Sequence, residues 1–293
     1  MSEISIEQMI REAGGESLAT WARREQARQD GVTEEALDAR MAGYLQVMRE
    51  SVVHGMDENL RSMSGMTGGQ APKLLRQAEG SRSALGALAG RACARALAIA
   101  ESNACMGKIV AAPTAGSCGI LPAALLTVQE AHHLSDDSLV RAMYLAAAIG
   151  QVIAERASIA GAQGGCQAEC GSAAAMAGAA VVYLLGGTNE QSADACCFAL
   201  MNSMGLVCDP VGGLVEIPCV YRNVSGVMNA LSAAEMALSG MRSLIPADQV
   251  IDAMKAVGDA MPASLRETGE GGVAACPGCA RFRSADALRR ASR

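Results

Sequence analysis

Apolar residues recur at spacings of three and four along most of the chain, which is the period of helices with one buried face. After Thr33 this pattern runs through Leu37, Met41, Tyr44, Leu45, Met48 and Val52. The segment SIEQ at 5–8 has the pattern of a capping box, SDDS at 135–138 marks another helix start, and Pro246 opens a helix that Pro262 ends. Alternation with a period of two is almost absent. The pattern predicts an all-α fold of about ten helices in a single domain.

Two Ala-rich stretches, SALGALAGRACARALAIAES and GCQAECGSAAAMAGAAVVYLL, have no wide polar face, as expected of helices that other helices enclose. The uncharged run at 170–189 approaches the length of a membrane span, but it consists largely of Ala and Gly. We therefore expect a buried core helix there and no membrane partner. We expect a helical extension at 1–31, the main helical domain at 32–275 and a tail at 276–293.

Composition narrows the class of protein. The 293 residues are 51% hydrophobic but only 2% aromatic, so small and aliphatic side chains must fill the core and the helices must pack closely. The formal net charge of −6 comes without a basic stripe, so nucleic acid is not expected as a partner. The N-terminal sequence lacks the pattern of a secretory signal, and we expect the eleven cysteines to be reduced thiols of a cytoplasmic protein.

Four loops between the expected helices are rich in glycine: 62–70, 112–119, 161–167 and 208–219. Glycine clusters let backbone amides approach a ligand closely, and successive amides can bind an anion. Tight interhelical turns would have the same composition. Both interpretations stay open on this pattern alone.

Cys166, Cys208 and Cys219 lie in these Gly/Pro loops, where thiolates can converge on a metal; zinc and an iron–sulfur cluster both suit three sulfur ligands. The other cysteines carry weaker signals. Cys170 follows Cys166 at a spacing that places both on one helix face. Cys276 and Cys279 form a C-x-x-C pair, and a zinc ribbon would need a second pair of this kind. We expect simple packing of the cysteines in Ala-rich helical stretches, Cys93, Cys105, Cys196 and Cys197.

Four segments, SNACMGKIVAAPTAGSCGILPA, GCQAECGSAAAMA, CDPVGGLVEIPCVYRN and MPASLRETGEGGVA, resemble the α subunit of the iron–sulfur-dependent bacterial L-serine dehydratases, also called L-serine ammonia-lyases. The resemblance covers about residues 50 to 275, in the family's order. It implies conversion of L-serine to pyruvate and ammonia. It also implies a [4Fe-4S] cluster held by three cysteines, which match Cys166, Cys208 and Cys219, with the fourth iron open to the substrate hydroxyl.

The serine carboxylate would need oriented donors, which two of the Gly-rich loops are suited to provide. The candidate substrate-binding residues are Ser62, Ser64, Gly65, Thr67, Thr114, Gly116 and Ser117. Each hydroxyl is equally suited to cap a helix. Lys108 and Lys73 lie beside these loops and are candidate general bases, although a residue of a partner chain is the first expectation.

Members of this family occur as one long chain with a β domain or as two subunits, so the resemblance implies a separate β subunit and a hetero-oligomer. The Ser-His-Thr segment that the family associates with substrate handling belongs to that β part. A further hypothesis is that Cys276 or Cys279 visits the fourth iron in the resting state.

Three other functions are alternatives to this assignment. A related cluster-dependent L-cysteine desulfidase would differ only in pocket detail, and a helical zinc-binding or scaffold protein would use the cysteines for stability. A pyridoxal-phosphate dehydratase would need an α/β fold, which the pattern does not support.

Overall fold

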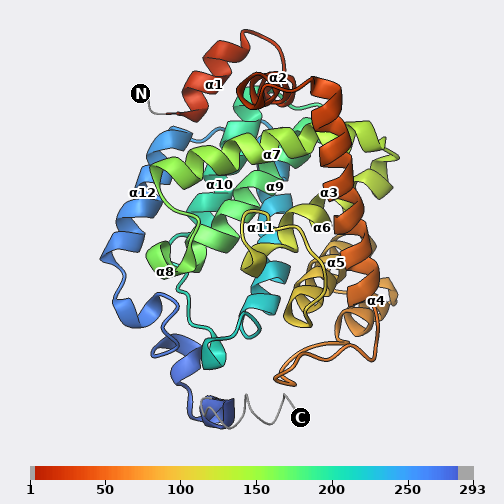
Figure 1. Ribbon diagram of the computed structural model, residues 1–293, viewed down its shortest axis with the longest axis vertical. Coiled ribbons are helices and arrows are strands. Elements are labelled where there is room, and N and C mark those ends of the chain that lie inside the picture. Colours follow the sequence, from red (N-terminus) through yellow and green to blue (C-terminus); the bar gives the residue numbers. More distant parts are fainter. Residues whose placement is uncertain (1–3, 283–293) are drawn as a thin grey trace.

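The computed structural model describes residues 4–282 of the chain (Figure 1). Its α-helices are α1 (Ile6–Ala13), α2 (Leu18–Asp30), α3 (Glu34–Gly55), α4 (Ala71–Glu79), α5 (Gly86–Ala104), α6 (Ile120–His132), α7 (Asp136–Arg156), α8 (Gly161–Gly164), α9 (Ser172–Leu184), α10 (Asn189–Ser203), α11 (Cys219–Leu238) and α12 (Ala247–Ala260). Shorter helical turns are η1 (Ala115–Ser117), the π-helix η2 (Gln167–Gly171), η3 (Val211–Gly213), η4 (Ala263–Leu265), η5 (Gly272–Ala275) and η6 (Pro277–Phe282). The described residues form no β-sheet. The prediction of an all-α fold is confirmed.

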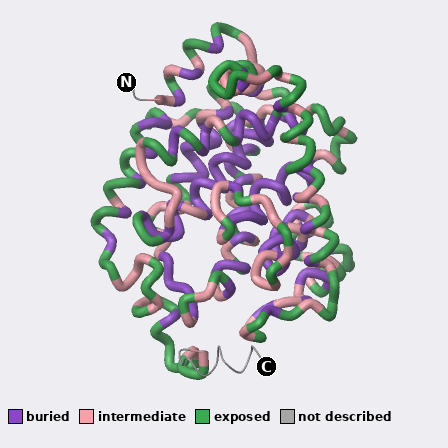
Figure 2. Tube along the Cα trace, viewed as in Figure 1, coloured by how far each residue is buried: buried purple, intermediate pink, exposed green. Residues whose placement is uncertain are grey.

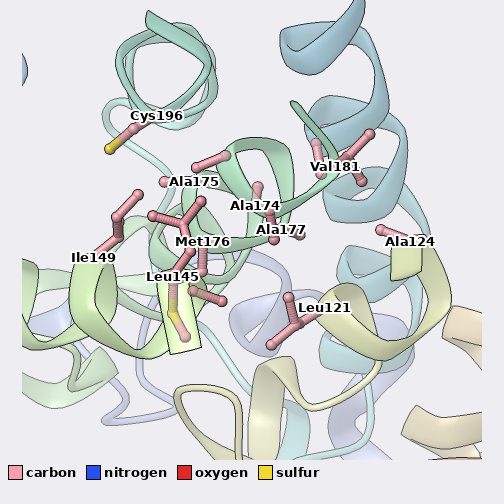
Figure 3. Close-up of a cluster of buried hydrophobic side chains, with 14 of the residues drawn as sticks. Leu121, Ala124, Leu145, Ile149, Ala174, Ala175, Met176, Ala177, Val181 and Cys196 are labelled. Atoms are coloured by element: carbon pink, nitrogen blue, oxygen red, sulfur yellow. The ribbon is translucent and has the colours of Figure 1, made fainter. Parts of the chain in front are cut away.

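Helix α9 lies at the centre of the bundle and packs against α6, α7, α10 and α11. Figure 2 shows the buried residues concentrated in this region, and Figure 3 shows side chains of α6, α7, α9 and α10 in one cluster that includes Met176. Nearly all of α9 is buried, and its many alanines let the neighbouring backbones approach closely. The uncharged run at 170–189 is therefore a core helix, as expected.

One helix of the described part, α7, is long and apolar enough to cross a membrane when judged by length and composition alone. Of its most apolar window, 61% is buried against the rest of the chain, which is the pattern of a core helix.

Local signals place several helix ends correctly, and the structure corrects one predicted cap and one predicted buried face. Ser135 caps α7, and α12 begins directly after Pro246 and ends before Pro262. Ser5 accepts a hydrogen bond from the Gln8 amide, but the Gln8 side chain donates to Glu12, so the expected capping box is only half formed. On α3 the predicted stripe is narrower than expected, because Tyr44 is 48% exposed.

The N-terminal helices are packed onto the main bundle. Asp248 of α12 accepts hydrogen bonds from the amides of Ile6 at 2.9 Å and Glu7 at 3.2 Å, and α2 packs against α7. The remaining parts of the expected extension and tail, residues 1–3 and 283–293, lie outside the described residues.

Loops from distant parts of the sequence meet on one side of this bundle. The turn η1, the π-helix η2 and the first part of α11 contact one another. These three elements carry or adjoin the motifs that the sequence analysis singled out.

Candidate functional site

The structure brings the three predicted cysteine ligands into one buried region. Cys166 directly precedes η2, Cys208 lies in the loop after α10, and Cys219 is the first residue of α11; all three are buried free thiols. Burial raises the pKa of the Cys219 thiol to about 12, and Cys166 adds to the rise. Burial also raises the pKa of Cys208, with contributions from Cys166 and Cys219. The three thiols therefore lie close enough to influence one another's charge.

The backbone around Cys208 is held by the segment before η5. The Cys208 amide donates to the Leu265 carbonyl at 2.8 Å, and the Glu267 amide donates to the Cys208 carbonyl at 2.7 Å. Between Cys208 and Cys219, Gly212 and Gly213 have φ of 64° and 72°, a left-handed conformation that glycine adopts without strain. The Gly-Gly pair thus lets the loop turn between the two cysteines.

Cys170 belongs to this region more closely than its spacing indicated. Its sulfur lies 3.4 Å from that of Cys166, one helical turn away. This hydrogen bond is the main cause that lowers the pKa of Cys166 and raises that of Cys170 well above its ordinary value. The weak signal of the four-residue spacing therefore corresponds to a real contact.

Glu169 is a candidate site residue that the sequence analysis missed. It is half-buried on η2, accepts a hydrogen bond from the Thr114 hydroxyl at 2.8 Å, and lies 4.0 Å from the Cys208 sulfur. Burial raises the pKa of its carboxyl, while the Thr114 hydrogen bond works against the rise. A Cβ on Gly161 would lie 2.8 Å from this carboxylate and 2.9 Å from the Cys208 sulfur, so the glycine leaves room for both. An acidic residue inside the motif GCQAEC was the available signal.

The predicted substrate hydroxyls already have partners within the chain. Ser62 and Ser64 donate to the same carboxylate oxygen of Glu216, at 2.6 and 2.7 Å. Thr67 donates to the buried Glu101 at 2.9 Å. Ser117 lies 3.1 Å from the Thr114 hydroxyl, which donates to Glu169.

The predicted Gly65 amide also has a partner within the chain, whereas Gly116 makes its contact through its carbonyl. The Gly65 amide donates to the Ser62 carbonyl at 3.0 Å, and the Gly116 carbonyl accepts from the Asn223 side chain at 2.7 Å. Substrate contact by this set of residues stays a prediction.

Lys73, Lys108 and the three histidines lie on other segments than the three cysteines. Lys73 is exposed on α4. Lys108 is also exposed and lines a cavity of about 830 Å³ together with residues of α3 and α7. None of the three cysteines lines this cavity. His54 is hydrogen-bonded to Ser102 at 2.8 Å, and the pair at 132–133 ends α6. A catalytic role for either lysine stays a prediction.

The segment with Cys276 and Cys279 packs against the loop between Cys208 and Cys219. Turns η5 and η6 both contact η3, and Cys279 lies 3.4 Å from the Val273 carbonyl. Cys276 is exposed. Contact of either thiol with a cluster iron stays a hypothesis.

The donor set fits a polynuclear cluster in its chemistry. Within residues 4–282 no group of three or more His, Cys, Asp or Glu side chains is arranged to hold a single metal ion. In a four-iron cluster each cysteine binds a different iron, so the sulfurs do not have to converge on one point. Cys166, Cys208 and Cys219 are three buried thiols that influence one another's pKa, and such a set can supply one ligand to each of three irons.

Comparison with known proteins identifies the family. The family model described as "Serine dehydratase alpha chain" matches residues 5–274. The chain belongs to this family. The match includes the N-terminal helices that were expected to form an extension.

Relatives of two lengths support the assignment. The "Probable L-serine dehydratase, alpha chain" of Bacillus subtilis is 50% identical over 84% of this chain and 81% of its own length. The "L-serine dehydratase, alpha chain" of Peptoniphilus asaccharolyticus is 44% identical over 85% and 86%. The "L-serine dehydratase" of Mycobacterium tuberculosis is 47% identical over 61% of this chain but only 40% of its own length. The serine dehydratase alpha chain family therefore includes this sequence, and part of the chain also matches a segment of a longer protein.

Proposed function

We propose that this chain is the α subunit of an iron–sulfur L-serine ammonia-lyase that converts L-serine to pyruvate and ammonia in the cytoplasm. The observation that carries the proposal is the grouping of Cys166, Cys208 and Cys219 in one buried region of a serine dehydratase alpha chain. These thiols come from two loops far apart in the sequence, and a packing role would not require them to meet.

In the proposed holoenzyme the three cysteines hold a [4Fe-4S] cluster. When bound, the cluster supplies a Lewis acid, an iron without a protein thiolate, that polarises the serine hydroxyl. The chain's own residues beside Cys208 would border such a cluster: Glu169 accepts a hydrogen bond from Thr114, and Gly161 has no side chain to fill the space next to Glu169 and Cys208. Burial of the cysteines excludes water from the cluster and raises the strength of nearby charges.

A separate β subunit is the proposed partner, in a hetero-oligomer. Two relatives are named "alpha chain", and the Mycobacterium tuberculosis relative has additional sequence beyond the region that this chain matches. We propose that the β subunit contributes the general base, since His54 bonds to Ser102 and the other two histidines end α6.

Anaerobic purification followed by iron and sulfide analysis tests the proposal. We expect iron and sulfide in equal amounts, and pyruvate from L-serine after addition of a β subunit. Cys208→Ser and Cys219→Ser should lose most of the iron while far-ultraviolet helicity is retained. Cys196→Ser, which changes a buried cysteine of α10, is the matched control and should keep its cluster. Zinc without iron in the wild-type protein, or full iron loading of both ligand variants, would contradict the proposal.

The L-cysteine desulfidase alternative is separated by product. Release of sulfide from L-cysteine at a higher kcat/KM than pyruvate from L-serine would favour it. We expect L-serine to be the better substrate, because the relatives are named for it.

A further inference from the structure

Arg222 links two of the cysteine-bearing segments. It lies on the first turn of α11, three residues after Cys219, and its side chain is 15% exposed. Its Nη1 donates to the Val207 carbonyl at 2.8 Å, and its Nη2 forms an ion pair with Asp209 at 2.8 Å. Both acceptors adjoin Cys208. One guanidinium group therefore holds the two neighbours of Cys208 from the helix that begins at Cys219.

The partner of Arg222 is itself fixed. Asp209 is 2% exposed, and its second carboxylate oxygen accepts the Val273 amide at 2.6 Å. A Cβ on Gly272 would lie 2.1 Å from that oxygen, so the C-terminal segment approaches as closely as its backbone allows. Asp209 thus joins the loop after α10, the first turn of α11 and η5.

The charge of Arg222 also acts on the cysteine region. Burial works against this charge, but Cys166 and Asp209 outweigh burial and hold the pKa of Arg222 above its ordinary value. In turn Arg222 counters the rise in the pKa of Cys219 and of Glu169. Three thiolates on a cluster, beside the carboxylate of Glu169, form a concentration of buried negative charge that requires a cation nearby.

Lysine would not replace this arginine. The planar guanidinium presents several N–H donors in a fixed fork, so it reaches two acceptors at once, whereas a lysine ammonium is a single point charge on a flexible stem. The two contacts on either side of Cys208 use this fork.

We propose that Arg222 is a positioning residue for the cluster site: its fork fixes Cys208 relative to Cys219, and its charge raises the reduction potential of the bound cluster. The inference rests on the proposed function, because it requires a cluster on these cysteines. Its physical basis is that each added electron makes the cluster more negative, so a nearby positive charge stabilises the reduced form more than the oxidised form.

The test compares anaerobically reconstituted wild-type protein with Arg222→Met, Arg222→Lys and Asp209→Asn. Iron and sulfide per chain report loading, and a redox titration followed by electron paramagnetic resonance reports the midpoint potential of the loaded molecules. We expect Arg222→Met to load less cluster and to shift the midpoint to a more negative potential. Arg222→Lys should load less cluster at a nearly unchanged potential, because it keeps the charge and loses the fork.

Asp209→Asn should shift the midpoint potential in the opposite direction from Arg222→Met. It removes a negative charge and keeps the Arg222 side chain, so the midpoint potential of its cluster should become more positive. A residue with only a structural role would change the amount of cluster but not the potential of the molecules that hold it. Arg23→Met is the matched control: Arg23, on α2, is 14% exposed and is paired with the carboxylates of Glu34 and Asp38, both on α3. It should match the wild type in both readouts.

The outcomes separate this inference from the proposed function. A wild-type chain that takes up no iron–sulfur cluster overturns both. A wild-type chain with a cluster, together with a wild-type midpoint in both Arg222→Met and Asp209→Asn, overturns this inference alone. If Arg222→Met does not fold, Arg222→Gln removes the same charge while keeping an amide donor, and a negative shift of its midpoint decides the electrostatic role of Arg222.

Discussion

Glu216 accepts a hydrogen bond from the Ser62 hydroxyl at 2.6 Å, although 154 residues separate the two in sequence. Glu216 lies between Cys208 and Cys219 and is 5% exposed, and the same oxygen accepts from Ser64 at 2.7 Å. This carboxylate therefore joins the first Gly-rich loop to the loop that carries two of the candidate cluster ligands. A substitution that displaces either loop is therefore expected to displace the other loop as well.

The first prediction concerns this contact. Ser62→Ala and Glu216→Gln should each lower the free energy of unfolding by about 1–3 kcal/mol, because each removes a hydrogen bond to a buried carboxylate. The double variant should lose less than the sum, with a coupling energy of about 1 kcal/mol or more. Urea unfolding of the four apo-proteins measures this cycle. Strictly additive losses would show that the two residues do not stabilise one another.

The second prediction concerns Glu101, which is fully buried on α5. Its carboxylate accepts the Thr67 hydroxyl at 2.9 Å and the amides of Gly68 at 2.9 Å, Gln70 at 3.0 Å and Ala71 at 3.2 Å. Glu101→Gln turns an amide NH₂ toward donors and should lower the free energy of unfolding by about 3 kcal/mol or more.

The control for Glu101 is the exposed Glu235 of α11. Glu235→Gln should change the free energy of unfolding by less than about 0.5 kcal/mol. Equal urea midpoints for the two variants would contradict the role of Glu101 as the anchor of the first Gly-rich loop.

The third prediction compares two glycines of α3. A Cβ on Gly55 would lie 1.9 Å from the Ala98 carbonyl oxygen, so Gly55→Ala must push α3 away from α5 and should cost at least about 2 kcal/mol. A Cβ on Gly43 meets nothing within 4 Å, so Gly43→Ala should stabilise the helix by about 0.5–1 kcal/mol. Thermal unfolding should therefore move in opposite directions. A rise in Tm for Gly55→Ala would refute the close helix crossing.

The fourth prediction concerns pH. The hydrogen bond from Arg49 and the one from Gln129 lower the pKa of Asp136 from its ordinary 3.8 to about 2. Because the folded-state pKa is the lower one, this pair stabilises the fold above about pH 4, and its contribution is lost as the pH falls toward 2. The Asp136 side chain is 61% exposed, so solvent screening limits the contribution to less than about 1 kcal/mol.

Asp136→Asn should accordingly be slightly less stable than the wild type at pH 7, and the difference should shrink between pH 4 and pH 2. Asp137→Asn, one residue further along the same helix, is the control for loss of a carboxylate in the first turn. Urea midpoints over this pH range provide the measurement. If the stability difference between Asp136→Asn and the wild type grows toward pH 2, the pKa of Asp136 is not lowered in the folded state.

The sequence alone determined the features that depend on residues close together in the chain, namely the helices and several of their ends. Helical periodicity, the Ser135 cap and the Pro246 start are local properties of the chain, and they correctly predicted an all-α fold and several helix ends. The buried position of α9 followed from its Ala-rich composition. Cys166, Cys208 and Cys219 were singled out because their loops differ in composition from the helices around them.

The tertiary structure decided which of these groups meet. Glu169 beside Cys208, Arg222 on both sides of Cys208, and Glu216 on Ser62 are contacts between segments brought together by the packing of whole helices. The physical reason is that helix propensity and capping depend on residues a few positions away, whereas a buried carboxylate or guanidinium takes its partner from whatever the fold places within about 3 Å. Local sequence therefore specified the elements, and only their packing specified the partners.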